Sequence, residues 1–424
     1  MSDIANALVR AFRNESSQIL AALMMYTSDI ELVEDVLQDA FVQAAEQWPD
    51  RRMPDNAAAW LFTVAKRRLF DRFRKMALRK KEETHQAIYH SLYEQHAHEL
   101  VNEDRQAEGD NEIPEERLRL IFTCCHPALS EEARVALTLK TLCGLTVKEI
   151  ARAFLSSESA MEQRLTRAKR KIRVAGIAYE IPEGDALTAR LPSVQSVIYL
   201  IYNESYSAYE GQTLTRDDFA VEAIRLARLL YALLPHSNNG GLLSLLLLHD
   251  SRRQARHCVA KGFVPLEEQD RRQWDTSLIL EGVAPLEKSM TTGPADVYKI
   301  QAAISALHSQ SPSWQATDWP QIALLYQSLY RLEPSPVVLL NQAVAVSHGG
   351  NPQGAYKLLE GIEEQLQNYQ PFYAARAHIN QQLDAPLLAL QDYAKAIQLS
   401  KNTIERDYLE KQYLQLQAKL ALQR

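Results

Sequence analysis

The sequence predicts an all-α protein, and three observations lead to that prediction. Apolar residues recur mainly at three- and four-residue spacings along the 424 residues, which is typical of amphipathic helices. The 14 glycines are too few for a sheet-rich architecture with many tight turns. A hydrophobic content of 46 % with 24 % charged residues excludes a disordered, collagenous or membrane-embedded chain.

The first predicted module spans residues 1–80 and consists of amphipathic helices. Its clearest apolar stripe runs from Leu32 to Ala44. The polar face of the same helix carries Asp35, Gln38 and Asp39. Prolines with Asp and Asn at 48–56 predict a break, followed by a second helix at 57–75.

The second half of that second helix interleaves aromatic rings with cations. From Lys66 to Lys81 the net charge is +8. Unpaired bases stack on aromatic rings while Lys and Arg hold the backbone, so this pattern is typical of a surface that melts duplex DNA. An alternative places Trp60, Phe62 and Phe73 in the core, which fits the aromatic residues equally well but leaves the cations unexplained.

Residues 81–112 predict a flexible acidic linker. The net charge over 82–112 is −8, and few of these residues are apolar, so an independent core is not expected. A short helix near 88–100 is compatible with the sequence.

The strongest local pattern is a helix-turn-helix within residues 113–176. Ser156 or Ser157 is expected to cap its second helix, whose buried side begins at Met161 and ends at Ile172. In such a helix the early outward residues reach base edges and the later cations meet phosphates. The outward positions proposed to bind DNA are Ser159, Glu162, Gln163, Arg164, Arg167, Lys169 and Arg170.

Charge distinguishes this reading from a helical hairpin with a solvated basic face. The net charge from Leu145 to Arg173 is +5, whereas the whole chain carries −6. A local basic patch in an acidic chain favours DNA binding.

The remainder of the chain predicts a helical extension at 177–290, with a hinge at 181–185, and a repeat domain at 291–424. Small or space-filling residues recur with a spacing of 34, the tetratricopeptide period: Ala343 and Ala377, Ala355 and Ala389, Leu359 and Tyr393. Helical hairpins of this type stack into an array whose concave face can receive a helix or peptide. We expect a chain that ends after Gly176 to fold and to keep its partner-binding surface.

Two clusters resemble reactive sites but favour structural roles. Cys124, Cys125 and His126 lack a second ligand pair nearby, so buried thiols are favoured over a zinc site. The segments at 248–256 and 270–275 contain acids, bases and a serine, but no nucleophile elbow or phosphate-binding glycine loop accompanies them. An ion-pair network between helices is favoured there. The sequence thus predicts no catalytic residue, no metal, no cofactor and no enzymatic activity.

The four cysteines do not form the regular spacing of a secreted disulfide scaffold. The most apolar run, Leu242 to Leu248, is far too short to span a bilayer. These observations predict a cytoplasmic location without a membrane anchor.

Together, these residues resemble the extracytoplasmic-function group of the sigma-70 family, the bacterial initiation factors of RNA polymerase. The segment Asp35 to Phe41 resembles the part that grips the polymerase clamp helices, which implies core-polymerase contacts for Asp35, Gln38 and Asp39. The segment from Trp60 resembles the part that melts and reads the minus-ten element. That resemblance implies DNA contacts for Trp60, Lys66, Arg67, Arg68, Arg72 and Arg74. Arg164 to Arg170 lie where the family reads the minus-thirty-five element.

The resemblance extends to a subgroup with a long C-terminal extension that ends in tetratricopeptide-like repeats. It rests on the segments 122–129, 200–206, 248–256 and 334–341. The subgroup is associated with small YCII-related proteins, which implies a YCII-related or another cytoplasmic regulatory partner for the extension. The chain departs from the family at Arg67, where Asn is frequent, and at Ser205, where Gly is frequent.

The resemblance implies a sigma factor that binds core RNA polymerase and promoter DNA, directs promoter-specific initiation of transcription and carries a C-terminal regulatory extension. Its first alternative is a free-standing helix-turn-helix regulator with a sensory repeat domain, which leaves the segment Asp35 to Phe41 unexplained. The second alternative is an enzyme with a helical accessory domain, whose reactive cluster would have to include His249, Asp250, Arg252 and Arg253.

Overall fold

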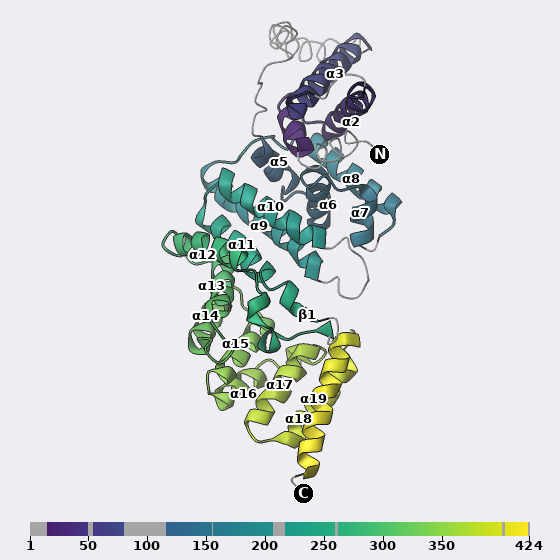
Figure 1. The fold of residues 1–424 in the computed structure, drawn as a ribbon. Coiled ribbons are helices and arrows are strands. Elements are labelled where there is room, and N and C mark those ends of the chain that lie inside the picture. The colour runs from purple at the N-terminus through teal and green to yellow at the C-terminus, as the bar shows by residue number, and fades with distance from the viewer. Residues whose placement is uncertain are drawn as a thin grey trace. The chain divides into compact units, whose positions relative to one another are not determined.

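The computed structural model describes residues 15–49, 54–79, 116–154, 156–206, 217–258, 262–400 and 403–422. These residues are helical except for short turns and two strands of two residues each, as Figure 1 shows. The strands, β1 (His257–Cys258) and β2 (Gly262–Phe263), pair antiparallel with His257 opposite Phe263. The predicted all-α fold is confirmed. The predicted acidic linker at 81–112 lies outside the described residues.

The chain divides into two compact units. Unit 1 comprises residues 1–206 and 213–222, and unit 2 comprises residues 207–212 and 223–424. Each unit is described separately.

The N-terminal module of unit 1 is built on helical residues 15–23, α2 (Ile30–Gln47) and α3 (Ala57–Arg79). Asp29 caps α2 by accepting a hydrogen bond from Leu32 N, and Asn56 accepts one from Ala59 N at the start of α3. The predicted apolar stripe faces α3, since Val33, Val36 and Ala40 are fully buried. In agreement with the predicted break, α2 ends at Gln47 and α3 begins at Ala57.

The helix-turn-helix module contains α5 (Arg117–Cys124), α6 (Glu131–Thr141), α7 (Val147–Ala153) and α8 (Glu158–Val174). Ser157 is the N-cap of α8, and its hydroxyl accepts a hydrogen bond from Ala160 N at 3.2 Å. The buried side of α8 consists of the predicted residues Met161, Leu165, Ala168 and Ile172. Gly176 ends the helix in the left-handed conformation with φ +62°, which a side chain would disfavour.

Helix α9 (Gly184–Tyr206) also belongs to unit 1, although it follows the predicted boundary at 176. It packs against α5 and α6 of the helix-turn-helix module. Arg190 donates a hydrogen bond to Phe122 O at 2.8 Å, and Ser193 donates one to Cys125 O at 2.7 Å. Two carbonyls at the C-terminus of α5, which lack partners within their own helix, are thus satisfied by α9.

Unit 2 contains most of α10 (Asp217–Leu233) and all of α11 (Ser237–Asp250), which is buried on every side from Asn239 to Leu248. The apolar run Leu242 to Leu248 is therefore a core helix. Helices α12 (Thr276–Met290) and α13 (Val297–Gln310) pack against it. Gly241 lets α13 approach closely, because a Cβ atom there would lie 2.7 Å from Lys299 Cγ.

Three short 3-10 helices lie between α11 and α12: η2 (Gln254–Arg256), η3 (Leu266–Glu268) and η4 (Arg271–Gln273). Arg271 of η4 donates hydrogen bonds to His308 O and Ser311 O at the end of α13. Tyr408 of the C-terminal helix contacts Glu268 of η3. This segment therefore links α13 to the C-terminal helix of unit 2.

The repeat region comprises α14 (Trp319–Leu332), α15 (Pro336–His348), α16 (Pro352–Glu360), η5 (Glu364–Leu366), α17 (Gln370–Gln382), α18 (Pro386–Leu399) and α19 (Thr403–Leu422). From α14 on, each α-helix packs on the next along the chain, as Figure 1 shows. The hairpins α15–α16 and α17–α18 begin 34 residues apart. Ala343, Ala355, Ala377 and Ala389 are fully buried at their contacts. The predicted helical hairpins therefore form at the predicted period.

Unit 2 also contains a row of aromatic and histidine rings, of which His308 and Trp319 are buried and Trp314, His348 and His378 are half-buried. Burial, with Arg252 and Arg271 nearby, lowers the pKa of His308 to about 3. Burial and His378 lower the pKa of His348 to about 4. Both imidazoles are neutral in the folded protein at neutral pH.

We expect unit 2 to lose stability as the pH falls from about 6.5 towards 4, because the unfolded state then binds protons that the folded state excludes. Above pH 6.5 neither state protonates these imidazoles, and the stabilisation is fully present. The melting temperature of the full chain measured between pH 7.5 and 5 checks this expectation. His308→Phe keeps the stacked ring and should weaken the pH dependence; an unchanged pH profile in that variant would contradict the assignment.

Candidate polymerase and nucleic-acid interfaces

The acidic face of α2 is only partly open to solvent. Asp35 and Gln38 are exposed, whereas Asp39 is half-buried and turned towards α3. Its Oδ2 lies 3.3 Å from Arg72 Nη2 and 3.6 Å from Arg68 Nη1. Asp39, which the sequence assigned to polymerase, thus pairs with arginines that the sequence assigned to DNA. Asp35 and Gln38 remain accessible to a partner.

The aromatic residues of α3 contribute mainly to packing within the N-terminal module. Trp60 is half-buried and packs edge-to-face on Trp48, with 5.5 Å between ring centroids. Phe73 is buried, and Phe62 is half-buried. The reading in which these rings are core residues therefore holds for Phe73, while Trp60 keeps part of its surface open.

The cations of α3 that the sequence assigns to DNA lie in different environments. Lys66 is 3 % exposed, and its ammonium lies over the rings of Tyr26 and Phe62. Arg68 and Arg72 pair with α2 as described above, and Arg68 also donates a hydrogen bond to Gln43 at 2.8 Å. Arg67 is half-buried, while Arg74 pairs with Asp71 of its own helix. In this arrangement, much of the predicted basic face satisfies carboxylates of the same module.

The outward face of α8 matches its prediction more closely. Ser159, Glu162, Gln163, Arg167 and Arg170 are exposed. Arg164 is half-buried and pairs with Glu132 of α6 at 3.1 Å, while Arg167 donates a hydrogen bond to Gln163. Lys169 differs from the rest, because its ammonium pairs with Glu34 of α2 and its side chain is 11 % exposed.

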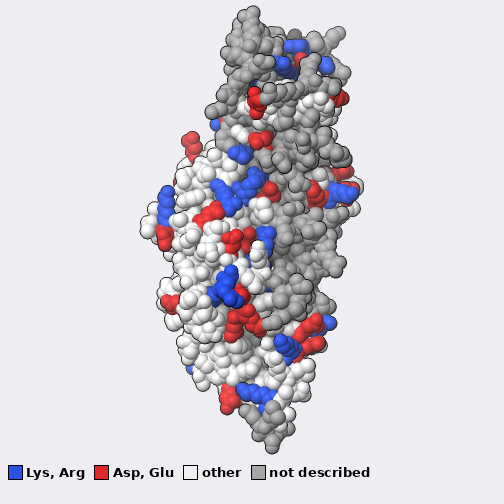
Figure 2. Space-filling model, viewed as in Figure 1, with Lys and Arg blue, Asp and Glu red and all other residues white. Residues whose placement is uncertain are grey.

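Charges of both signs are interspersed over the described residues of the face in Figure 2. No broad basic field covers the described part of that face, in keeping with the net charge of −6.

The two cysteines next to His126 are buried thiols. Cys124 Sγ lies 3.2 Å from Thr141 Oγ1, and Cys125 Sγ lies 3.6 Å from Thr138 Oγ1. Burial raises the pKa of Cys125 to about 12 and raises that of Cys124 further. Both thiols are therefore protonated at neutral pH, which makes them poor metal ligands and poor nucleophiles.

At 248–256 and 270–275, where an ion-pair network between helices is expected, two ion pairs are local. Arg253 pairs with Asp250 three residues earlier, and Arg272 pairs with Asp270. A link to another element runs through Arg271, which donates to backbone carbonyls at the end of α13. Residue spacing alone cannot distinguish a carbonyl partner from a carboxylate partner.

Sequence reasoning missed contacts that join the two modules of unit 1. Glu34 and Asp29 of the α2 region pair with Lys169 and Arg173 of α8. Charge patterns show which faces are acidic and basic, but two faces more than 100 residues apart give no sign that they meet.

Comparison with known families matches three segments of the chain. Residues 11–79 match Sigma-70 region 2, and residues 119–172 match Sigma-70 region 4. Residues 190–290 match a family of unknown function, DUF6596. The match to region 2 covers α2 and α3, and the match to region 4 covers α5 to α8.

The similarity to one curated protein runs through nearly the whole chain. "Uncharacterized protein R00370" of Rhizobium meliloti (strain 1021) is 39 % identical over 405 residues, which cover 95 % of this chain and 94 % of that protein. No solved structure matches the chain. In the described part of the chain, every helix is too short or too polar to cross a membrane. With regions 2 and 4 in order and DUF6596 after them, the chain belongs to the sigma-70 family of RNA polymerase sigma factors, as an extracytoplasmic-function-like member with a C-terminal extension.

Proposed function

We propose that this sigma factor carries its own regulator: region 2 binds core polymerase, region 4 docks on promoter DNA, and the extension controls both within the bacterial cytoplasm. The observation that carries the proposal is α9. This helix lies in the DUF6596 segment yet packs on region 4 through Arg190 and Ser193. The proposal requires no covalent chemistry, cofactor or metal.

Exposed Asp35 and Gln38 are the residues proposed to contact polymerase. The double variant Asp35→Ala/Gln38→Ala should lower the affinity for core polymerase and the run-off transcription yield by the same factor. Surface changes of this kind usually alter stability by no more than about 0.5 kcal/mol, so the fold should persist. A competition assay against labelled wild-type chain measures the affinity; unchanged affinity would exclude these two side chains from the interface.

For region 4 we propose that Arg164 contacts base edges and that Arg170, later on the exposed face, contacts phosphates. Arg164→Ala should cost roughly 1–3 kcal/mol on the matching upstream element and relax base preference. Arg170→Ala should weaken binding to all sequences alike and lower the salt slope by about 1. Binding titrations on matched and scrambled duplexes distinguish the two; equal losses for Arg164→Ala on both duplexes would contradict base readout.

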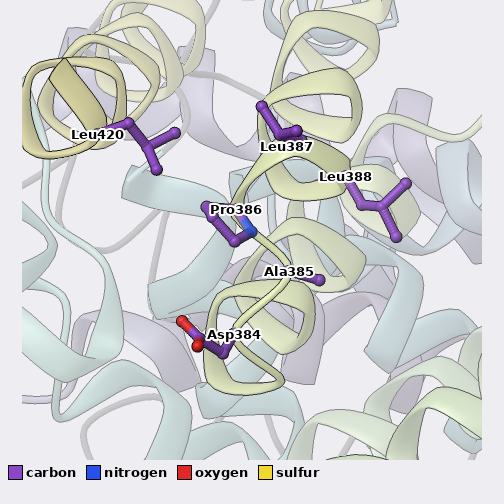
Figure 3. Close-up of a pocket in the computed structure, with 6 residues that line it drawn as sticks. All are labelled: Asp384, Ala385, Pro386, Leu387, Leu388 and Leu420. Carbon is purple, nitrogen blue, oxygen red and sulfur yellow. The ribbon is translucent and has the colours of Figure 1, made fainter. Parts of the chain in front are cut away.

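We further propose that the extension binds a regulatory partner, which is a YCII-related protein or another cytoplasmic protein. An open recess of about 350 Å³ supports it at the end of the repeat region. Figure 3 shows Leu387 of α18 and Leu420 of α19 on two sides of this recess, with Pro386 between them. Leu387 is 62 % exposed, so the recess offers apolar surface of the kind that a partner's side chain fills.

A further inference from the structure

Two ion pairs connect region 2 to the recognition helix of region 4. Lys169 Nζ pairs with Glu34, and Arg173 Nη1 lies 2.7 Å from Asp29 Oδ2. Lys169 and Arg173 are one turn apart on α8, so they present one face of that helix to the start of α2. We call the residues Asp29, Glu34, Lys169 and Arg173 the latch.

The Lys169–Glu34 pair of the latch is more enclosed than an ordinary surface ion pair, whereas the side chain of Arg173 is 46 % exposed. The side chains of Lys169 and Glu34 are 11 % and 23 % exposed, and that of Asp29 is 26 % exposed. Solvent screening is weaker for such partly buried charges. Asp29 is also fixed in place, because its Oδ1 accepts the capping hydrogen bond from Leu32 N.

A third contact joins the same modules beside the latch. The Tyr179 hydroxyl, which follows α8, donates to Ala21 O at 2.7 Å and lies 3.3 Å from Glu116 O. Ala21 belongs to the helical residues 15–23 of region 2, and Glu116 is the N-cap of α5. Region 2 and region 4 therefore meet through the two ion pairs of the latch and through the Tyr179 hydroxyl.

We infer that the latch holds the free chain in a closed state in which Lys169 is withheld from DNA, and that the chain must release the latch before region 4 engages a promoter. This inference rests on the proposed DNA contact of α8. An ammonium paired with Glu34 cannot also neutralise a phosphate, so carboxylates of region 2 compete with the DNA backbone. A DNA-competent state that is only fractionally populated lowers the apparent affinity by that fraction.

The first test detects the latch without DNA. A zero-length carbodiimide couples a carboxylate to an amine that it touches, so treatment of the full-length chain should form a Glu34–Lys169 cross-link, identified by mass spectrometry. Glu34→Gln should abolish that peptide pair. Absence of the cross-link in the wild-type chain would overturn the inference, whether or not the chain directs transcription.

The second test measures the competition. Full-length Glu34→Gln should bind a short duplex of arbitrary sequence about threefold to tenfold more tightly than the wild type at low salt, because nonspecific binding depends on phosphate contacts. Glu46→Gln is the matched control, since Glu46 is exposed near the other end of α2 and its change removes the same charge. Equal affinities for the two variants would overturn the inference. Asp29→Asn, which keeps a good capping residue, should add to the effect of Glu34→Gln.

Failure of the latch and failure of the proposed function give different results. A chain that forms the cross-link but gives no run-off transcript with core polymerase supports the closed state and contradicts the sigma-factor roles assigned to its residues. A chain that gives transcript but shows neither cross-link nor the difference between Glu34→Gln and Glu46→Gln contradicts the latch alone.

Discussion

Contrary to the expectation from the sequence, a chain that ends at Gly176 should lose the stable fold of region 4, whereas a chain that ends at Tyr206 should keep it. The difference is α9, whose Val194, Val197 and Ile201 are fully buried. Burial of each such side chain contributes roughly 1.5–3 kcal/mol, so loss of the helix removes a large share of the module's stability. Its removal also leaves the carbonyls of Phe122 and Cys125 without the donors that Arg190 and Ser193 supply.

Amide hydrogen exchange in α5 to α8, measured in both fragments, tests this expectation. Protection should be retained in the fragment ending at Tyr206 and lost in the fragment ending at Gly176; equal protection in both would show that α9 is dispensable. The longer fragment also tests the regulatory role, because it lacks all of unit 2. Its run-off yield should differ from that of the full chain while its affinity for core polymerase persists.

Much of the fold was predictable because local patterns determine it. The apolar stripe of α2, the Ser157 cap of α8 and the 34-residue period of the hairpins each depend on residues close in sequence. The left-handed Gly176 also marks the end of α8. Helix periodicity and capping therefore sufficed for these elements.

The candidate site was less predictable, because its geometry depends on contacts between distant segments. Lys66 belongs to a basic run, yet its ammonium is buried over aromatic rings. Asp39 belongs to an acidic face, yet it pairs with Arg72 of α3. The sequence shows whether a helix face is acidic or basic. The partner of each charged side chain depends on which helices pack together.

Arg376→Ala should be among the most destabilising substitutions in unit 2, at about 3–5 kcal/mol. Arg376 of α17 pairs with Asp392 of α18 through two nitrogens and with Glu363 at 2.7 Å. Its guanidinium also lies over the Phe372 ring. Burial lowers the pKa of Arg376, but the hydrogen bonds that its guanidinium donates to the two carboxylates outweigh burial and raise that pKa.

Arg376→Ala lowers the free energy of unfolding because it leaves the Asp392 carboxylate buried without its cation. The Asp392 side chain is only 7 % exposed. Its Oδ2 would still accept from Asn380 Nδ2 at 2.8 Å, but a neutral amide does not balance the charge. The melting temperature of unit 2 should fall by more than about 6 °C, since 1 kcal/mol corresponds to about 2–4 °C in a unit of this size.

The preceding repeat supplies a matched control for this prediction. Thirty-four residues before Arg376 and Asp392 the chain carries Gln342 and Leu358, an uncharged pair in the same hairpin position. The double variant Arg376→Gln/Asp392→Leu removes both charges together, so it should cost less than Arg376→Gln alone, which leaves Asp392 buried and unbalanced. Hydrogen exchange in α17 and α18 localises the effect. If the double variant were as unstable as the sum of its two single variants, the ion pair would not explain the loss, and the cause would lie in the packing of the Arg376 side chain on Phe372 and Tyr373.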